Sequence, residues 1–178
     1  MNTTTPDILN KAAQIQLVIF DVDGVFTDGR LYFDNNGDEY KAFHSRDGYG
    51  IKMLLLNGGI HVAVISGRRA ASVERRMADL GIHRAYLGIE NKCAIFYNLL
   101  NELKLNPEQV AFVGDDLIDL PVMRQVGLAI TVHDADPFVC QHAHWKTPHR
   151  GGRGAVRDVC EFLLDARGEL AAMRERYL

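Results

Sequence analysis

The stretch Leu17-Val18-Ile19-Phe20-Asp21-Val22-Asp23-Gly24 decides the fold of this chain. Its apolar beginning predicts a strand from about Gln16 to Phe20, because a nearly continuous apolar run is typical of a central strand covered on both faces. Two carboxylates follow one residue apart, before a glycine at which the chain can turn. Residues i and i+2 just past a strand can point into one pocket, so the pair predicts a nucleophile and a proton donor, or a metal site.

Short β-branched runs alternate with longer helical patterns along the rest of the chain. This alternation predicts an α/β fold with a central parallel sheet and crossover helices. Further strands are expected at about 60–65, 85–87, 110–113 and 127–132. Helices are expected at about 47–57, 70–80, 90–104 and 155–167, and the first of them should end at Gly58-Gly59.

A β-hairpin is predicted between the first strand and its crossover helix. Strand-like runs at 30–33 and 39–43 flank Asp34-Asn35-Asn36-Gly37-Asp38, and an Asn-Gly pair in such a place is a strong hairpin signal. The hairpin, at about residues 29–43, must project from the edge at which the strands end. Ligands bind at that edge in open parallel sheets, so the hairpin is expected to act as a flap.

The composition bounds the size of the protein and excludes some partners. The 178 residues, 47% of them apolar, can form one core, so a single domain over residues 1–178 is expected. A net charge of -3 provides no basic surface for nucleic acid or an anionic membrane. Three cysteines without a CxxC pair predict free thiols in a reducing compartment. Residues 1–14 do not resemble a leader and no apolar run reaches about 20 residues, so a cytoplasmic protein is expected.

Further polar residues follow the other predicted strands or begin a helix. Ser66 ends the second strand, and Lys92 stands at a helix start. Asp115, Asp116 and Asp119 follow the strand at 110–113. Because parallel strands end along one edge, several carboxylates would meet there and repel one another without a cation, and oxygen ligands suit Mg²⁺. A hydroxyl and an ammonium beside that ion would bind a phosphoryl group, whose charge is spread over three oxygens.

Together these motifs resemble the four motifs of the haloacid dehalogenase superfamily of phosphatases: Asp21-Val22-Asp23-Gly24, Ser66, Lys92, and Gly114-Asp115-Asp116 with Asp119. The resemblance implies a Rossmann-like three-layer α/β/α core. It implies that Asp21 is the nucleophile that forms an aspartyl-phosphate, and that Asp23 protonates the leaving group and later activates water. It also implies Mg²⁺ held by Asp21, Asp115 and the backbone carbonyl of Asp23, phosphate held by Ser66 and Lys92, and supporting roles for Gly67, Asp116 and Asp119.

Most of the chain, about residues 15–165, resembles more narrowly the family of 3-deoxy-D-manno-octulosonate 8-phosphate phosphatases. The resemblance rests on 21–29, Asn35-Asn36-Gly37, 45–51, Ser66-Gly67-Arg68, 114–123 and 151–157. It implies Mg²⁺-dependent hydrolysis of that sugar-acid phosphate in lipopolysaccharide biosynthesis. It further implies a capless homotetramer, in which the hairpins gather centrally and a neighbouring subunit closes each active site. The intervals in which a cap domain could be inserted are too short to hold one.

A sugar-acid substrate carries a carboxylate, and the fork of an arginine side chain matches that group. Arg68 follows Ser66 by two residues and Arg76 lies two helical turns further on, so both are candidate substrate ligands. Arg46 precedes Asp47-Gly48, where helix N-terminal amides could also hold an anion. The resemblance implies that residues 44–48 and Lys52 lie near the substrate, as does Asp23. His44 and Lys52 stand where the family resemblance implies Asn and Arg.

Other interpretations of these residues remain open. Asp47, Asp119 and Asp136 each fit a helix N-cap. The same scaffold could serve the phosphate of a nine-carbon sugar acid, such as sialic or ketodeoxynononic acid, or it could be a non-catalytic interaction module. The loop Gly151-Gly152-Arg153-Gly154 is expected to be a hinge that lets the C-terminal helix and tail, about residues 155–178, reach a neighbouring active site.

Overall fold

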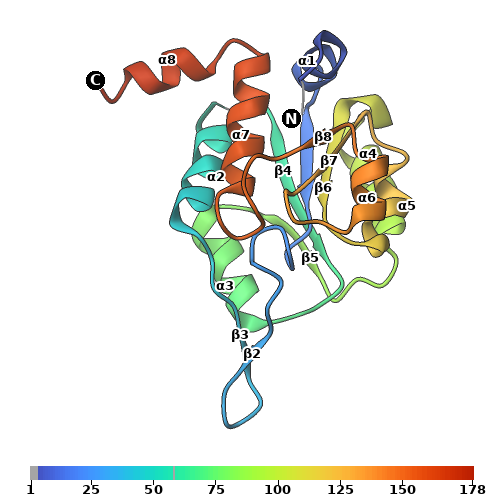
Figure 1. Cartoon of the computed structure of the whole chain (residues 1–178), viewed down its shortest axis with the longest axis vertical. Helices are drawn as coiled ribbons and strands as arrows, with labels where there is room; N and C mark the ends of the chain where they lie inside the picture. Colours follow the sequence, from blue (N-terminus) through green and yellow to red (C-terminus); the bar gives the residue numbers. More distant parts are fainter. Residues whose placement is uncertain (1–3, 58) are drawn as a thin grey trace.

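A central parallel sheet carries the fold in the computed structural model, which describes residues 4–57 and 59–178. The strands of this sheet are β1 Leu17–Phe20, β4 His61–Ser66, β5 Arg84–Leu87, β6 Val110–Gly114, β7 Leu128–Thr131 and β8 Trp145–Lys146. They lie in the order β5-β4-β1-β6-β7-β8 (Figure 1). All of their pairings are parallel, as the alternation of strand and helix patterns predicts.

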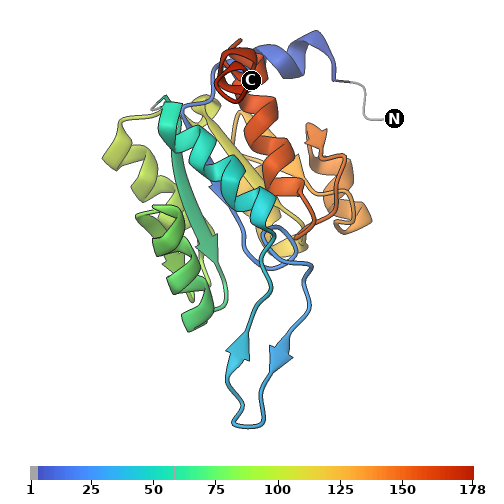
Figure 2. The same ribbon diagram turned by 90° about the vertical axis from the view of Figure 1, so that its left-hand side faces the viewer.

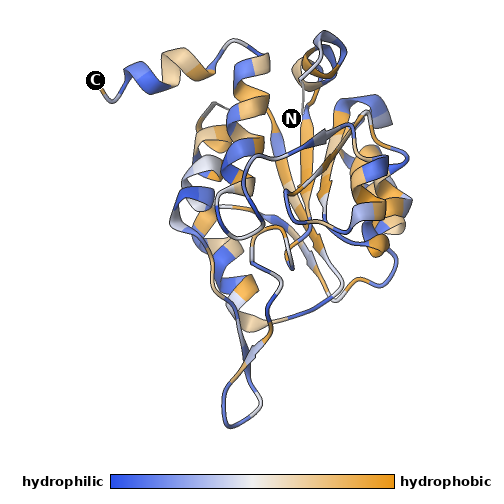
Figure 3. Ribbon diagram, in the orientation of Figure 1, coloured by the Kyte–Doolittle hydropathy of each residue, from blue (hydrophilic) through white to orange (hydrophobic). Residues whose placement is uncertain are grey.

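The stretch that predicts the first strand forms the centre of this sheet. All four residues of β1 are fully buried. Val18 and Phe20 belong to the core on one face of the sheet, and Leu17 and Ile19 to the core on the other. Figure 3 shows hydrophobic residues along the strands and polar residues on the outer surfaces of the helices. The strand order reverses beside β1, so the ends of β1 and β6 border the position at which α/β sheets bind ligands.

Helices cover both faces of the sheet, which gives the expected three-layer α/β/α arrangement. One core contains residues of α1 Pro6–Ala13, α2 Ser45–Asn57, α3 Ala71–Leu80 and α7 Ala155–Ala166. The other contains residues of α4 Lys92–Leu103, α5 Leu120–Met123 and α6 Pro137–His142. The last helix, α8 Leu170–Glu175, lies at the end of the molecule opposite the hairpin (Figure 1).

The predicted strands and longer helices are confirmed, with small shifts in their limits. The helix expected from Asp47 begins at Ser45, and Gly58, at which it was expected to end, lies outside the described residues. The predicted elements do not include α1, α8 or β8, and of α5 and α6 the sequence indicates only the starts, through the candidate caps Asp119 and Asp136. None of the helices in residues 4–57 and 59–178 is both long and apolar enough to cross a membrane.

The predicted hairpin projects from the body of the protein (Figure 2). Its strands, β2 Tyr32–Phe33 and β3 Glu39–Tyr40, pair antiparallel and are shorter than the runs at 30–33 and 39–43 that predict them. The rings of Tyr32 and Tyr40 stack with their centroids 5.5 Å apart. Between β1 and α2, which the structure describes without a gap, the chain forms no folded unit besides this hairpin. The fold is therefore capless.

Asp47 connects α2 to the start of α7. Its buried carboxylate accepts hydrogen bonds from the backbone N–H groups of Gly154, at 3.2 Å, and Arg157, at 2.9 Å. Burial raises the pKa of this carboxyl group, and the two N–H donors oppose that shift. Because α2 begins at Ser45, the prediction that Asp47 caps its own helix is wrong. The N-cap residue of α7 is Gly154, which has no side chain to accept hydrogen bonds from the start of the helix. The carboxylate of Asp47 accepts them in its place.

Replacing Asp47 with Ala is expected to destabilise the protein by about 1–3 kcal/mol, because buried N–H donors at the start of α7 lose their acceptor. The free energy of unfolding in urea measures this loss. The matched control is Asp79→Ala, which removes only an exposed carboxylate 3.3 Å from Arg75 and should cost at most about 0.5 kcal/mol. Equal effects of the two substitutions would show that Asp47 does not anchor α7.

The glycine-rich loop at residues 151–154 is packed against the turn that follows β1. The N–H of Gly152 donates to the carbonyl of Val25 at 2.9 Å, and the N–H of Gly151 donates to Asp134 Oδ1 at 3.0 Å. A Cβ on Gly151 would lie 1.6 Å from the carbonyl oxygen of Gly24, so a glycine is required for this approach. The prediction of a hinge is therefore wrong, because the loop supports the turn that carries the predicted catalytic residues.

Candidate active site

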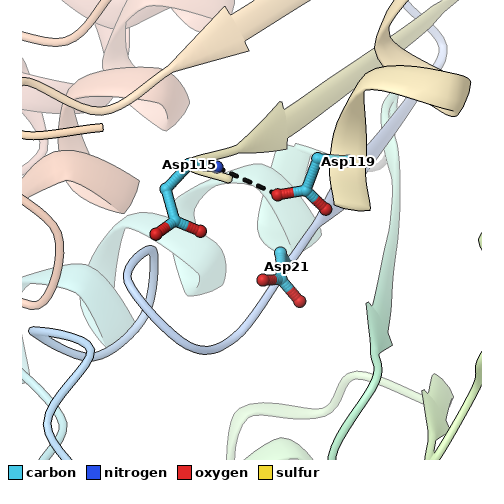
Figure 4. Close-up of side chains that lie close together, drawn as sticks. All are labelled: Asp21, Asp115 and Asp119. Atoms are coloured by element: carbon cyan, nitrogen blue, oxygen red, sulfur yellow. Dashed lines mark hydrogen bonds between the residues drawn. The ribbon is translucent and has the colours of Figure 1, made fainter. Parts of the chain in front are cut away.

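Three carboxylates and a lysine meet where β1 and β6 end. Asp21 directly follows β1, and Asp115 directly follows β6. Asp119 is the last residue of a short 3-10 helix, η2 Leu117–Asp119. Carboxylate oxygens of the three lie within 4.8 Å of one another (Figure 4). Lys92, the first residue of α4, places its Nζ atom 2.9 Å from Asp21 Oδ1 and 2.7 Å from Asp119 Oδ1. The fold therefore brings these four predicted residues together in one cluster.

Asp119 positions its neighbours in this cluster. Its side chain is fully buried, and Oδ2 accepts hydrogen bonds from the N–H groups of Asp115, at 3.0 Å, and Asp116, at 3.4 Å. Figure 4 shows the first of these bonds. Asp119 stands at the N-cap position of α5, as predicted, but its side chain makes no capping hydrogen bond there. The carboxylate that caps is that of Asp116, which begins η2 and accepts from the N–H of Leu117 at 2.7 Å. Asp119 thus holds both Lys92 and the backbone that carries Asp115.

The surroundings of the cluster disfavour the ionised forms of two of its carboxylates, Asp21 and Asp115. Burial, with the negative charge of Asp119, raises the pKa of Asp21 to about 7, although Lys92 opposes the shift. Burial, with the charges of Asp119, Asp21 and Asp116, raises the pKa of Asp115 to about 8. Burial disfavours the charged form of Lys92, but the two carboxylates at its Nζ atom outweigh this and raise its pKa. The cluster consequently holds a permanent ammonium and more carboxylates than that ammonium can neutralise.

Ser66 lies at the same edge of the sheet. Phe20 is in register with Val64 on the neighbouring strand, so the ends of β1 and β4 reach the same level. The Ser66 side chain is buried, and its Oγ atom accepts a hydrogen bond from the N–H of Arg68 at 3.2 Å. A Cβ on Gly67 would meet only an ordinary contact at 3.8 Å, so nothing in the structure requires a glycine there.

Lys41 is a residue at this site that the sequence analysis missed. It directly follows β3, and its ammonium forms ion pairs with Asp23 Oδ1 and with Glu39 Oε1. Its side chain is 1% exposed, which is unusual for a lysine without a structural reason. Glu39 also pairs with Arg68 Nη2 at 2.7 Å, and the hydrogen bond from Arg68, with the ammonium of Lys41, lowers the pKa of Glu39. The hairpin is therefore connected to the turn after β1 and to the loop after β4.

Five of the seven predicted substrate ligands form two groups, and Arg46 and Asp47 belong to neither. Asp23 and Arg68 lie at the hairpin base through the contacts of Lys41 and Glu39. Gly48, Lys52 and Arg76 line a separate cavity of about 260 Å³ between α2 and α3, which none of the clustered carboxylates lines. Arg46 is exposed, and the Asp47 carboxylate is directed to α7.

Gly48 makes room for the arginine of this cavity. A Cβ at Gly48 would lie 2.2 Å from Arg76 Nη2. The guanidinium carbon of Arg76 lies 5.8 Å from the centroid of the Phe43 ring, and its buried Nε atom has no hydrogen-bond partner among the described residues. Arg76 therefore enters the cavity with unused hydrogen-bonding capacity.

The arrangement of carboxylates fits a hard divalent cation. Both oxygens of Asp119 already accept hydrogen bonds, so Asp21 and Asp115 remain as the carboxylates that can coordinate an ion. A Cβ on Gly24 would lie 2.0 Å from Asp115 Oδ2, so the glycine lets Asp115 pack against the turn that contains Asp23. The available donors are oxygens, and a cation among them would favour the ionised carboxylates that burial and mutual repulsion disfavour, the two causes that raise both pKa values. Such a donor set suits Mg²⁺.

Comparison with known sequences finds a family and close relatives. Residues 46–127 match the family model of haloacid dehalogenase-like hydrolases. The 3-deoxy-D-manno-octulosonate 8-phosphate phosphatase KdsC of Salmonella typhimurium is 52% identical over 166 residues, which are 93% of this chain and 88% of that protein. The protein of the same name from Escherichia coli K12 is 53% identical over 92% of this chain and 87% of that protein.

Solved structures agree with these relatives. A probable YrbI family phosphatase from Pseudomonas syringae has a TM-score of 0.94 and 50% identity, covering 97% of this chain and 98% of that one. The 3-deoxy-D-manno-octulosonate 8-phosphate phosphatase of Moraxella catarrhalis, in complex with magnesium, phosphate and KDO, has a TM-score of 0.93 and 35% identity, covering 97% and 98% of the two chains. The chain therefore belongs to the haloacid dehalogenase-like hydrolases, in the family of the 3-deoxy-D-manno-octulosonate 8-phosphate phosphatases.

Proposed function

We propose that this protein is a Mg²⁺-dependent phosphatase that hydrolyses 3-deoxy-D-manno-octulosonate 8-phosphate to KDO and phosphate, in the cytoplasm, as a step of lipopolysaccharide biosynthesis. The observation that carries the proposal is the buried cluster of Asp21, Lys92, Asp115 and Asp119 at the ends of β1 and β6. Identity of 52% to a phosphatase of this name, over 93% of the chain, supports the choice of substrate. The whole chain would act as one catalytic domain.

Asp21 is the proposed nucleophile of the first half-reaction. One of its oxygens attacks the phosphorus, the bond between phosphorus and the sugar oxygen breaks, and an aspartyl-phosphate forms. Asp23, two residues further on, gives its proton to the departing sugar oxygen. Lys92 and Ser66 bind the phosphoryl oxygens, and the ammonium of Lys92 also favours the ionised form of Asp21.

Asp23 is the proposed base of the second half-reaction. It takes a proton from a water molecule, whose oxygen attacks the phosphorus while the bond to the Asp21 oxygen breaks. The products are phosphate and the original Asp21 carboxylate, and Asp23 is again protonated. Asp21, Asp115 and the backbone carbonyl of Asp23 would hold Mg²⁺, which when bound supplies positive charge beside the phosphoryl oxygens.

The effect of Mg²⁺ on stability is expected to grow with pH. Asp21 and Asp115 have pKa values of about 7 and about 8 in the folded protein, whereas an unfolded aspartate has a pKa of about 3.9. The stability that the raised values contribute is therefore complete below the unfolded pKa, falls as the pH rises from there, and is lost once the pH exceeds the folded values of about 7 and about 8. The Tm of the metal-free protein should fall over that range, and Mg²⁺ should restore it.

Tm measurements in EDTA and in Mg²⁺, on both sides of that range, check this expectation. For a chain of this size, each kcal/mol lowers Tm by about 2–4 °C. The variant Asp115→Asn should show a smaller fall with pH and a smaller response to Mg²⁺. A Mg²⁺ effect that is the same at low and high pH would contradict the assignment of Asp21 and Asp115 as its ligands.

A panel of phosphate esters tests the proposed substrate. kcat/KM in Mg²⁺ is measured for 3-deoxy-D-manno-octulosonate 8-phosphate, for sialic acid 9-phosphate and ketodeoxynononic acid 9-phosphate, and for simple hexose phosphates. The proposal expects the eight-carbon ester to have the highest kcat/KM. A much higher value for a nine-carbon ester would replace the substrate and keep the reaction. No Mg²⁺-dependent phosphate release from any ester would leave the non-catalytic alternative.

The protein is further proposed to form a homotetramer in which a neighbouring subunit closes each active site. In support, the projecting hairpin has Phe33 54% and Tyr40 52% exposed, which is apolar surface that an assembly could bury. The cavity lined by Lys52 and Arg76 does not include the carboxylate cluster of its own chain, which leaves it available to a neighbour.

Light scattering after size-exclusion chromatography measures the mass of the assembly. Replacing both Phe33 and Tyr40 with Lys should give a smaller species with reduced kcat/KM, since charged side chains would have to be desolvated in the contact. The matched control replaces Tyr97, which is 49% exposed on α4, with Lys. A wild-type monomer with full activity would contradict the proposed assembly.

A further inference from the structure

Lys41 is a buried lysine, and a buried ammonium requires partners that compensate its charge. Its side chain is 1% exposed, at the base of a hairpin that otherwise projects from the protein. Burying an ammonium costs several kcal/mol unless partners compensate it. Its two partners are the carboxylates of Asp23 and Glu39, whose side chains are 22% and 12% exposed. The ammonium therefore lies between the hairpin and the turn that carries the proposed acid and base.

The contact with Asp23 is selective for one oxygen. Lys41 Nζ contacts Oδ1, and Oδ2 has no hydrogen bond or ion pair among the described residues. One carboxylate oxygen is thus fixed by the protein, while the other is left for a substrate oxygen or a water molecule. A proton donor must lie within hydrogen-bond reach of the atom that it protonates, so the orientation of this side chain decides whether it can act.

Glu39 holds the ammonium in place from the hairpin side. Its Oε1 atom contacts Lys41, and its Oε2 atom accepts from Arg68 Nη2 at 2.7 Å. Arg68 is connected in turn to the phosphate-binding loop, because its N–H donates to Ser66 Oγ at 3.2 Å. The hairpin therefore contacts Asp23, the proposed acid–base residue, through Lys41. It is connected to the proposed phosphate site through Glu39, which binds Arg68.

We propose that Lys41 is a positioning residue for the acid–base carboxylate: its ammonium holds Asp23 through Oδ1, so that Oδ2 faces the reacting oxygen, and Glu39 holds that ammonium in place. The assay part of this inference rests on the proposed phosphatase function. Lys41 acts through Asp23 and not on the phosphoryl group. Its loss should therefore slow the steps in which Asp23 transfers a proton and leave phosphate binding intact.

The kinetic test compares two leaving groups. A sugar alkoxide needs a proton to depart, whereas p-nitrophenolate departs without one. With the sugar phosphate, Lys41→Met should lower kcat by about 10- to 100-fold, because misplacement by about 1 Å can cost that much, and KM should change little. The two substrates are compared by kcat/KM, which ends when the leaving group departs and so excludes the later step in which Asp23 acts as the base. With p-nitrophenyl phosphate the loss in kcat/KM should be below about 3-fold, since general acid catalysis contributes little there. Lys41→Arg, which keeps the charge, should restore part of kcat.

Two further measurements separate positioning from a general structural effect. In the Asp23→Asn background, Lys41→Met should add almost nothing, because the group that it positions is already gone. Lys104→Met, on an exposed lysine at the far end of α4, is the matched control and should leave both substrates unaffected. If Lys41→Met does not fold, Glu39→Gln serves in its place and should give a smaller loss with the same difference between the two substrates.

A crystal structure of Lys41→Met decides the inference without an assay. The expected result is a moved Asp23 carboxylate in an otherwise unchanged turn. An Asp23 carboxylate in its original position, an equal loss of kcat/KM with both substrates, or an additive loss in Asp23→Asn would each overturn the inference. If the wild-type protein does not hydrolyse 3-deoxy-D-manno-octulosonate 8-phosphate, the proposed function fails by itself. The position of Asp23 in Lys41→Met then still decides the role of Lys41.

Discussion

Replacing Asp21 with Asn is expected to abolish phosphate release, with a fall in kcat on the order of 10⁵- to 10⁶-fold, as for other enzymes that lose their nucleophile. The amide has the shape of the carboxylate, but it cannot form the acyl-phosphate bond. It also carries no charge with which to coordinate Mg²⁺ or pair with Lys92, which lies 2.9 Å from Asp21 Oδ1. Phosphate release from the sugar phosphate in Mg²⁺ measures the loss.

The stability of this variant should change in the opposite direction. Burial and the charge of Asp119 raise the pKa of Asp21 to about 7, so its ionised form is unfavourable in the metal-free protein. Asp21→Asn removes that cost, and its Tm in EDTA above that pH should be equal to or higher than that of the wild type. The control is Asp165→Asn on the surface of α7, which should change neither property. Substantial activity in Asp21→Asn would contradict the assignment of the nucleophile.

Replacing Lys92 with Met should cost both activity and stability. The side chain of Lys92 is 3% exposed, and that of its partner Asp119 is 0% exposed. Removing one partner of a buried ion pair costs about 3–5 kcal/mol, because the other charge is left uncompensated. The loss of a cation beside the phosphoryl group should lower kcat by about 10²- to 10³-fold, the range for one missing donor to a transition state. Urea unfolding and phosphate release measure the two effects.

A second substitution separates the two roles of Lys92. In the double variant Lys92→Met, Asp119→Asn, the uncompensated carboxylate is neutralised, so most of the lost stability should return. Activity should stay low, because the ammonium beside Asp21 is still missing. A double variant that regains activity together with stability would mean that Lys92 serves only the fold.

Much of the site could be predicted because the fold gathers residues that the sequence places at the ends of strands. Asp21, Ser66 and Asp115 each stand at the end of a predicted strand, and a parallel sheet brings such ends to one edge. The structure adds the partners. Asp119 binds Lys92, and Asp47 caps α7 and not its own helix. Both contacts join residues that lie far apart in the chain. Local patterns do not contain such contacts.

Lys41 was missed because a lysine in a predicted hairpin is most often exposed. A signal was present, since Glu39 and Lys41 alternate along a strand and so share one face, opposite in charge and next to the proposed site. The prediction of a hinge at residues 151–154 was wrong for a related reason. Glycines suggest flexibility, whereas Gly151 is required by the close approach of the Gly24 carbonyl. The cap at Asp136 was predicted and is confirmed, because its signal is local: the carboxylate accepts from Phe138 N–H at 2.7 Å.

The aspartyl-phosphate at Asp21 is the central claim, and chemical trapping tests it most directly. The protein is mixed with Mg²⁺ and the sugar phosphate, quenched during turnover and treated with borohydride, which reduces an acyl phosphate to an alcohol. Peptide mass spectrometry then locates the reduced residue. We expect homoserine at position 21 in the wild type and none in Asp21→Asn. Reduction at another carboxylate, or no reduced residue from a protein that turns over its substrate, would contradict the proposed mechanism.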